Sequence, residues 1–337
     1  MKIKTAVLGY GRNGSTMHAG AIENSSDFEM VAVCDIDSER RKQAETSFNC
    51  NTYHDYEKML KGEDLDLVTI VTYSDLHAEH TCDCLNAGVN VLVTKPWCVN
   101  EAEAREMIKA RNKSGKLLLP WLPSRWGSTF KRLQKLVKEK VIGDIFYLRR
   151  GVYSFGIRND WQTLKERGGG YVLNWGPHIV DPPIQLFGEK VDTVYGQTGQ
   201  EMNPGNAEDW FMSLITLENG VKIQAEYNIA VKGLPDWFIQ GDRETIIVNK
   251  NKITIYQAEI KEADDPTSYN RIVSEPEVIE EKVGEDIYGN TDEVYRAVAA
   301  AVKGESEFPV SCNSALYLTR VLDAIKISAN KDKMVKF

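Results

Sequence analysis

The sequence predicts an α/β N-terminal domain with a doubly wound parallel sheet, followed by an α+β C-terminal domain with an open, mainly antiparallel sheet. Three observations predict this. Short apolar runs alternate with helical stretches over the first third of the chain, a glycine-rich turn follows the first run, and later strand patterns recur without helices between them. Strands that are apolar along their whole length belong to parallel sheets covered on both faces.

The first domain is expected to span residues 1–122. Its buried strands are the apolar runs at 5–8, 30–34, 67–71, 89–93 and 116–119. Helices are expected between them at about 14–24, 38–47, 55–61, 76–87 and 100–113. Pro120 and Pro123 then interrupt the pattern, and we place the domain boundary there.

The second domain is expected to span residues 123–337. A helix at about 127–140 opens it, and helices at about 291–303 and 312–329 close it, with Ser311 placed to cap the last. Strands are expected at 145–153, 191–197, 210–217, 221–228, 245–248 and 253–256. Asn219-Gly220 between two of them predicts a hairpin. The acidic segment 259–286 is expected to form a surface loop or an edge of the sheet.

Composition excludes several classes of protein. With 42% hydrophobic and 27% charged residues, the 337-residue chain is typical of a globular protein. Its net charge of −8 argues against nucleic-acid or anionic-membrane binding. No apolar run approaches the ~18–20 residues of a membrane helix, no export signal opens the chain, and the six cysteines lack a disulfide spacing. We therefore expect a soluble, cytoplasmic protein.

A glycine-rich motif predicts a dinucleotide site. Gly9-Tyr10-Gly11-Arg12-Asn13-Gly14 leaves a predicted strand and opens a predicted helix, so its backbone can approach a pyrophosphate. Asp35 ends the second strand, 21 residues beyond Gly14, where a carboxylate can accept hydrogen bonds from the adenine ribose. The same carboxylate would repel a 2′-phosphate, which favours NAD over NADP, although Arg40 and Arg41 lie nearby. The cofactor contacts expected here are Gly9, Gly11, Arg12, Asn13 and Asp35.

Two later stretches carry distinctive motifs. The first runs from V-T-Y-S-D-L-H at 71–77 to A-G-V-N-V-L-V-T-K-P at 87–96, and the second is G-G-G-Y-V-L-N-W-G-P-H-I-V-D at 168–181. Together they resemble the Gfo/Idh/MocA oxidoreductases, the relatives of glucose–fructose oxidoreductase and inositol dehydrogenase. The resemblance implies a Rossmann domain and hydride transfer between a nicotinamide and a carbon of a sugar or cyclitol. It also implies a homodimer or homotetramer built through the open sheet.

The resemblance assigns further residues to the cofactor site and shows three departures from the family pattern. It implies that Thr72, Tyr73, His77, Lys95 and Pro96 line the cofactor, with a cis peptide before the proline. Where the family usually has T-P after the fourth strand, this chain has Thr72-Tyr73, and where it usually has E-K-P, this chain has T-K-P at 94–96. The family's catalytic aspartate is replaced by Asn174.

Oxidation of a secondary alcohol requires a base, and histidine suits this role because its unperturbed pKa lies near neutral pH. His178 follows a glycine-rich stretch and opens an apolar helix, so it is the predicted acid/base. On the residues alone, a helix-capping or buried structural histidine is the more ordinary interpretation, and the resemblance is what favours catalysis. Lys95 ends a predicted parallel strand, where its ammonium can stabilise an alkoxide. Asn174 is expected to orient the histidine ring without supplying charge.

Aromatic residues in the middle of the chain suggest a sugar platform. Trp97 and Trp161 are the predicted sugar contacts and Arg125 the predicted fork for hydroxyls, together with Lys95 and His178, while Trp121 and Trp175 are expected to pack. His77, His80 and Cys84 share one face of a predicted helix, but a structural zinc site requires four ligands, so no metal is expected.

The sequence therefore predicts an NAD-dependent sugar or polyol dehydrogenase with a small carbohydrate or cyclitol substrate. Two other interpretations remain open. The first is a glycosidase or lyase that uses NAD only transiently, and the second is a non-catalytic dinucleotide-binding sensor.

Overall fold

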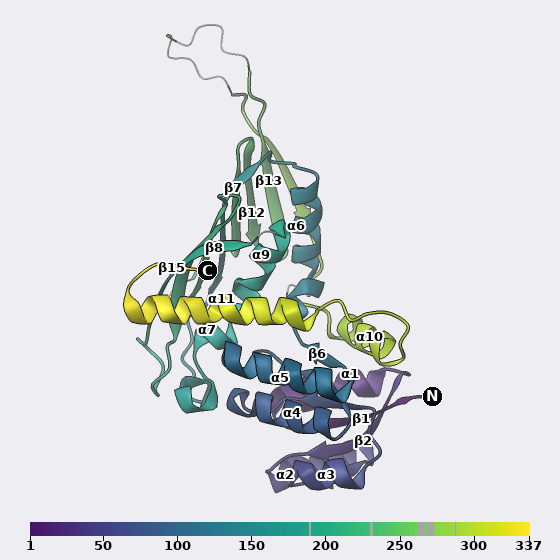
Figure 1. Cartoon of the computed structure of the whole chain (residues 1–337). Helices are drawn as coiled ribbons and strands as arrows, with labels where there is room; N and C mark the ends of the chain where they lie inside the picture. The colour runs from purple at the N-terminus through teal and green to yellow at the C-terminus, as the bar shows by residue number, and fades with distance from the viewer. Residues whose placement is uncertain (189, 230–231, 262–266, 268–272, 287) are drawn as a thin grey trace. The chain divides into compact units, whose positions relative to one another are not determined.

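The computed structural model describes every residue except 189, 230–231, 262–266, 268–272 and 287 (Figure 1). Contacts divide the chain into two compact units. The first unit comprises Met1–Pro123, Asp160–Asn174 and Asn290–Asp323. The second comprises Ser124–Asn159, Trp175–Gly289 and Ala324–Phe337. No helix in the described part of the chain is long and apolar enough to cross a membrane.

The first unit contains a six-stranded parallel sheet in the order β3-β2-β1-β4-β5-β6. Its strands are β1 (Ile3–Leu8), β2 (Phe28–Cys34), β3 (Asn51–Tyr53), β4 (Leu67–Ile70), β5 (Asn90–Val93) and β6 (Leu118–Pro120). The predicted parallel sheet is confirmed, and β4 is fully buried, as a strand covered on both faces should be. Strand β3 was not predicted, because its three residues are polar or only half-buried.

Helices of the first unit begin and end near the predicted positions. They are α1 (Ala19–Asn24), α2 (Ser38–Phe48), α3 (Tyr56–Gly62), α4 (His77–Asn86), α5 (Glu101–Ser114) and α10 (Thr291–Val302), and Figure 1 shows α4 beside α5. The helix predicted at 14–24 begins instead as a π-helical turn over Gly14–His18. Short 3₁₀ turns occur at Ser74–Leu76, Trp161–Thr163 and Lys165–Arg167, and the one-turn helix α7 spans Tyr171–Asn174.

The second unit contains a nine-stranded sheet in the order β14-β13-β12-β11-β7-β10-β9-β8-β15. Its strands are β7 (Ile145–Tyr153), β8 (Val191–Gly199), β9 (Trp210–Leu217), β10 (Lys222–Asn228), β11 (Trp237–Gly241), β12 (Glu244–Asn249), β13 (Lys252–Gln257), β14 (Glu277–Lys282) and β15 (Val335–Lys336). All pairs are antiparallel except β7 with β10, so the mainly antiparallel sheet is confirmed with one parallel pair. The predicted hairpin joins β9 to β10, and Gly220 has a φ of 89° there.

Three strands of this sheet were not predicted. Strand β11 is short and follows a proline, and β15 has only two residues. Strand β14 is acidic and exposed at the edge of the sheet, within the segment expected to form a loop or an edge. Residues 262–266 and 268–272 of that segment lie outside the described residues.

Helices of the second unit cover one face of this sheet. The 3₁₀ turn Pro123–Trp126, α6 (Ser128–Lys138), α8 (Gly176–Ile179) and α9 (Asp181–Phe187) precede the first long strands, and Figure 1 shows α6 and α9 together. Helix α11 (Cys312–Lys331) belongs to both units, and the predicted cap is confirmed because Ser314 N donates to Ser311 Oγ at 3.1 Å. Alternate residues of β9 are buried and half-exposed, so the other face of this strand is partly open.

Candidate active site

The glycine turn after β1 is built so closely that only glycine fits at two positions. Gly9 has a φ of 97°, and a Cβ there would lie 2.7 Å from the carbonyl carbon of Val71. A Cβ on Gly14 would lie 2.0 Å from Gly9 O. Gly11 has more room, because the nearest atom to its Cβ would be Arg40 Nη1 at 3.6 Å. The turn brings its backbone N–H groups to the end of the sheet, where a pyrophosphate can bind.

Asp35 fixes this turn from the end of β2. Its side chain is 5% exposed, Oδ2 accepts a hydrogen bond from Tyr10 N at 2.7 Å, and Oδ1 accepts one from Asp37 N at 2.9 Å. Arg40 Nη1 lies 3.7 Å from Oδ2. The carboxylate therefore shapes the glycine turn, at the position where the motif predicts a ribose contact. Arg12 and Asn13 are exposed on the same turn. These residues fit a dinucleotide.

His77 joins two loops at the ends of β4 and β5. Nδ1 lies 2.7 Å from Pro96 O, and Nε2 lies 3.1 Å from Thr72 O. Burial lowers the pKa of His77 to about 4, and the two carbonyl groups oppose that shift only in part. His77 thus holds together the loops that carry the predicted cofactor contacts. Its own contact with the cofactor stays a prediction.

Lys95 is held by Asn174 within the first unit. The Lys95–Pro96 peptide bond is cis, as the resemblance implied. Lys95 Nζ donates to both the backbone O and Oδ1 of Asn174, each at 2.9 Å. The Asn174 amide in turn donates to Gln162 Oε1 at 3.0 Å. Asn174 therefore positions the lysine ammonium, a role that the sequence did not indicate, and its effect on His178 stays a prediction.

The predicted sugar contacts of the first unit have different surroundings. Trp161 packs against Tyr73 with ring centroids 5.2 Å apart, and the Arg167 guanidinium lies 5.2 Å from the Tyr73 centroid. Trp97 is 4% exposed, and its indole N–H donates to Thr319 Oγ1 at 2.7 Å. The contacts of Trp97 are those of a packing residue and lend its predicted substrate role no support.

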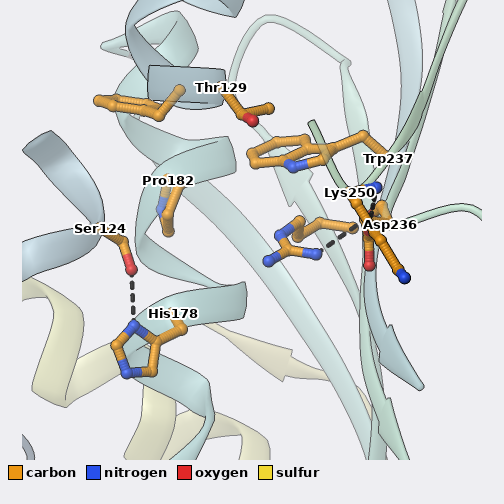
Figure 2. Close-up of a pocket in the computed structure, with 9 residues that line it drawn as sticks. Ser124, Thr129, His178, Pro182, Asp236, Trp237 and Lys250 are labelled. Atoms are coloured by element: carbon orange, nitrogen blue, oxygen red, sulfur yellow. Dashed lines mark hydrogen bonds between the residues drawn. The ribbon is translucent and has the colours of Figure 1, made fainter. Parts of the chain in front are cut away.

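His178 lies in helix α8 of the second unit and is 8% exposed. Its Nδ1 is 2.6 Å from the hydroxyl of Ser124, which is itself buried (Figure 2). Trp175 and Tyr288 lie beside the imidazole, with ring centroids 5.7 and 5.4 Å away. Trp175 also stacks on Tyr227, in keeping with its predicted packing role. The sequence did not point to Ser124, because no local pattern indicates that it contacts a histidine 54 positions further along the chain.

An ion pair braces this histidine helix. Arg125 donates through Nε and Nη2 to the two carboxylate oxygens of Asp181, at 2.8 and 2.7 Å. Asp181 is 1% exposed, so the pair is buried and bidentate. The ion pair therefore links Arg125, the residue after Ser124, to Asp181, which is three positions beyond His178. The predicted role of Arg125 as a fork for substrate hydroxyls stays a prediction.

A pocket of the second unit includes both His178 and Ser124 (Figure 2). Residues from β7, β11, α6 and α9, together with one residue before β11 and one after β12, form the rest of its wall. The lining residues are Ser124, Thr129, Phe130, Arg150, His178, Pro182, Asp236, Trp237 and Lys250. The pocket therefore combines a histidine with cationic, acidic and aromatic side chains.

The residues considered for a metal are occupied by the protein. His80 Nδ1 lies 3.1 Å from Thr72 Oγ1, and its ring packs on Tyr56. Burial raises the pKa of the Cys84 thiol to about 12. Across the residues that the structure describes, no group of three or more His, Cys, Asp or Glu side chains is arranged to hold a metal ion.

Comparison with known proteins identifies the class. A model described as oxidoreductase family, NAD-binding Rossmann fold, matches residues 3–120. A second, described as oxidoreductase family, C-terminal alpha/beta domain, matches residues 134–337. The chain therefore belongs to the Gfo/Idh/MocA oxidoreductase family, which confirms the resemblance. It is an oxidoreductase whose first domain binds NAD.

Individual relatives are similar over most or all of the chain. The scyllo-inositol 2-dehydrogenase (NADP(+)) IolW of Bacillus subtilis is 23% identical over 353 aligned positions, covering 99% of this chain and 95% of the relative. The D-glucoside 3-dehydrogenase of Escherichia coli is 29% identical over 73% of each chain. A solved NAD-binding protein from Listeria innocua is 25% identical with a TM-score of 0.83, covering 100% of this chain and 97% of that one.

Proposed function

We propose that this oxidoreductase transfers a hydride between NAD and a secondary alcohol of a sugar, sugar derivative or cyclitol. The observation that carries the proposal is the buried Ser124–His178 pair at the wall of a pocket. A histidine in this setting can exchange a proton with a bound hydroxyl. The named activities of relatives, a scyllo-inositol and a D-glucoside dehydrogenase, support the substrate class.

His178 acts as the acid/base in this proposal. Because Ser124 engages Nδ1, proton exchange with the substrate falls to Nε2. In the oxidation, Nε2 takes the hydroxyl proton while the carbon loses its hydrogen as hydride, so the alcohol becomes a carbonyl group. NAD, when bound, accepts that hydride. Ser124 keeps the imidazole in one orientation through the reaction.

Lys95 supports the same step electrostatically. Its ammonium stabilises the oxygen that becomes negative as the proton leaves. Asn174 engages two of its three protons, one through the backbone and one through the side chain. Asparagine at this position hydrogen-bonds the lysine ammonium without placing a carboxylate against it, so no negative charge at residue 174 offsets its positive charge.

Cofactor binding is assigned to the glycine turn and to Asp35. Gly9, Gly11, Arg12 and Asn13 would hold the pyrophosphate, and Asp35 would face the adenine ribose. The Asp35 carboxylate disfavours a 2′-phosphate, which makes NAD the preferred dinucleotide. Thr72, Tyr73, His77 and Pro96 would border the nicotinamide.

Absorbance of reduced nicotinamide tests the proposal. Purified protein and NAD are mixed with hexoses, amino sugars, glycosides, sugar acids and inositols, beside a His178→Ala variant. The proposal predicts NADH formation with one substrate class, abolished by the substitution. An inactive panel, with NAD binding shown separately, would contradict the dehydrogenase and favour transient oxidation or a sensor role.

We further propose a homodimer or homotetramer that forms through the face of the sheet opposite α6 and α9. The half-exposed apolar side chains on this face are Tyr147, Met212, Leu214, Phe238 and Ile247, of which Phe238 and Ile247 are paired across β11 and β12. Light scattering tests this. A Leu214→Asp variant should dissociate the assembly, and a wild-type protein that is monomeric at micromolar concentration would contradict it.

A further inference from the structure

A tight loop of the first unit fixes the backbone of Gln162. Its backbone N donates to Asp160 Oδ1 at 2.9 Å, and its backbone O accepts from Gly170 N at 2.9 Å. A Cβ on Gly169 would lie 2.5 Å from Gln162 O, and Gly170 has a φ of 100°, so the loop requires glycine at both positions. The glycine stretch therefore folds the chain back onto Gln162.

The side chain of Gln162 ends against the amide of Asn174 in the same unit. Asn174 is 7% exposed, and its Nδ2 donates to Gln162 Oε1 at 3.0 Å. Its Oδ1 and its backbone O each accept from Lys95 Nζ at 2.9 Å. The three side chains form one series of hydrogen bonds, which runs from the ammonium through the Asn174 amide to the Gln162 carbonyl group.

The direction of these hydrogen bonds follows from the groups that make them. An ammonium only donates, so Asn174 presents its oxygen to Lys95. The amide nitrogen of Asn174 then faces Gln162 and requires an acceptor there, which Oε1 supplies. An asparagine at this position therefore needs an acceptor for its nitrogen. An aspartate would bring no N–H group and would need none.

Loss of the acceptor at residue 162 would be felt at Lys95. The Asn174 nitrogen would be an unsatisfied donor in a buried place, which costs free energy. The side chain would turn toward another acceptor, because the last torsion of asparagine is broad, and Oδ1 would leave the ammonium. Gln162 thus acts on Lys95 through Asn174.

The loop itself does not depend on the Gln162 side chain. Its turn is closed by backbone groups of Gln162 and by Thr163, whose Oγ1 donates to Asp160 O at 2.8 Å. Substitution of the Gln162 side chain leaves all of these bonds in place. Its contact with Asn174 is therefore separable from the fold of the loop.

We propose that Gln162 is a positioning residue, whose side-chain carbonyl group holds the Asn174 amide so that Oδ1 stays on the Lys95 ammonium. Gln162 compensates for asparagine at the position where the family usually has aspartate. Its effect on turnover rests on the proposed function, whereas its effect on Lys95 does not.

Chemical labelling of Lys95 tests this assignment without substrate or NAD. The full chain is treated with a trace of acetic anhydride at pH 8, and mass spectrometry compares acetylation of Lys95 with that of the exposed Lys42. Only the unprotonated amine reacts. Gln162→Met should raise labelling of Lys95 about threefold, because loss of an acceptor favours the neutral amine. Unchanged labelling would overturn the proposal.

Gln162→Glu is the conservative variant. A carboxylate oxygen can accept from Asn174 Nδ2 as the amide oxygen does, and its charge favours the protonated lysine. Labelling of Lys95 should therefore stay at or below the wild-type value. A rise equal to that of Gln162→Met would contradict the role of the acceptor.

The Asn174→Asp background separates positioning from a general effect on the loop. Because aspartate has no N–H group to satisfy, adding Gln162→Met to Asn174→Asp should leave labelling of Lys95 unchanged from Asn174→Asp alone. A threefold rise in both backgrounds would show that Gln162 acts on the loop as a whole, and would overturn the proposal.

Thr163→Val is the matched control in the same turn. It removes the hydrogen bond to Asp160 O from a residue that is 4% exposed, and it does not alter the contact with Asn174. The melting temperature should fall, but labelling of Lys95 should not change. Labelling that rises as much as in Gln162→Met would contradict the assignment.

The two proposals can fail separately. With a substrate identified, Gln162→Met should lower kcat about threefold to tenfold and leave the KM for NAD unchanged, because the displaced ammonium acts on the substrate oxygen. An unchanged kcat would overturn the positioning role. The predicted order of labelling without any NADH formation would keep the effect on Lys95 and contradict the dehydrogenase. NADH formation that requires His178, with labelling unaffected by Gln162→Met, would keep the dehydrogenase and overturn this inference.

Discussion

Buried basic side chains serve opposite purposes in the two units. In the first unit, His18 and His77 are enclosed and bonded to groups of the protein itself: His18 Nδ1 lies 3.0 Å from Tyr295 Oη, and His77 bridges two backbone carbonyl groups. In the second unit, His178 and Arg150 line a pocket, and Arg150 Nε has no partner among the described residues. The difference separates histidines bonded within the fold from basic side chains that lie at the wall of a pocket.

The largest expected effect is on catalysis in the second unit. Replacing His178 by alanine should lower the turnover rate about 10³-fold, because general acid–base catalysis typically contributes 10²- to 10⁴-fold. The melting temperature should change little in comparison. Steady-state rates and thermal unfolding measure the two effects.

His54→Ala is the control for this substitution, since His54 is exposed in the first unit. An equal loss of activity in the control, or full activity in His178→Ala, would contradict the assignment of catalysis to His178 of the second unit.

The second prediction concerns acid stability of the first unit. Burial lowers the pKa of His18 to about 3 and of His77 to about 4, whereas both titrate near 6.5 when unfolded. The unfolded chain therefore binds more protons below pH 6.5, and the free energy of unfolding falls as the pH drops toward the folded pKa values. Between pH 7.5 and 5 each histidine should cost about 2 kcal/mol.

Denaturant unfolding at several pH values measures this slope. His77→Gln should flatten it, whatever the effect on absolute stability, and His54→Gln should leave it unchanged. A slope that is the same in wild type and His77→Gln would show that His77 is not held neutral by burial.

A third, smaller effect is expected at the glycine turn. A Cβ on Gly14 would lie 2.0 Å from Gly9 O, so Gly14→Ala should distort the turn and weaken NAD binding about tenfold or more, as overpacking costs about 1–3 kcal/mol. The matched variant is Gly20→Ala, because a Cβ on Gly20 meets no atom within 4 Å. NAD affinity, measured by fluorescence titration, should be unaffected there. Equal affinities in both variants would refute the role of the turn.

The smallest predicted effect is a shift in pH dependence. Asn174→Asp places a carboxylate against Lys95 and adds negative charge to the site, which favours the protonated forms of Lys95 and His178. The acid limb of the pH–rate profile should move up by about one unit. Asn112→Asp, on an exposed helix position, is the control. An unchanged profile in Asn174→Asp would exclude coupling between residue 174 and the acid/base.

The sequence predicted most of the fold because periodicity and turn residues are local. Strands β7 and β9 have the predicted bounds, and Asn219-Gly220 forms the predicted hairpin. The parallel pairing of β7 with β10 could not be predicted, because the two strands are far apart in the chain. The hydrogen bond from Arg149 to Glu226 between them joins residues 77 positions apart. Short or acidic strands such as β14 were missed for lack of an apolar pattern.

The site was predictable only in part. The glycine motif, Asp35 and the cis peptide before Pro96 follow from local motifs or from the family resemblance. Ser124 was not visible, because its partner is distant in the chain. Arg150 had a local signal that was overlooked: an arginine alternates with Leu148 and Val152 on a strand whose core face is otherwise apolar.

Isotope transfer tests the central claim most directly. The protein is incubated with NAD and a sugar or cyclitol that carries deuterium on its ring carbons, and the recovered dinucleotide is analysed by mass spectrometry. Hydride transfer promoted by His178 predicts deuterium on the nicotinamide with wild type and about 10³-fold slower incorporation with His178→Ala. Undeuterated dinucleotide from wild-type protein, with NAD and the sugar both shown to bind, would contradict it.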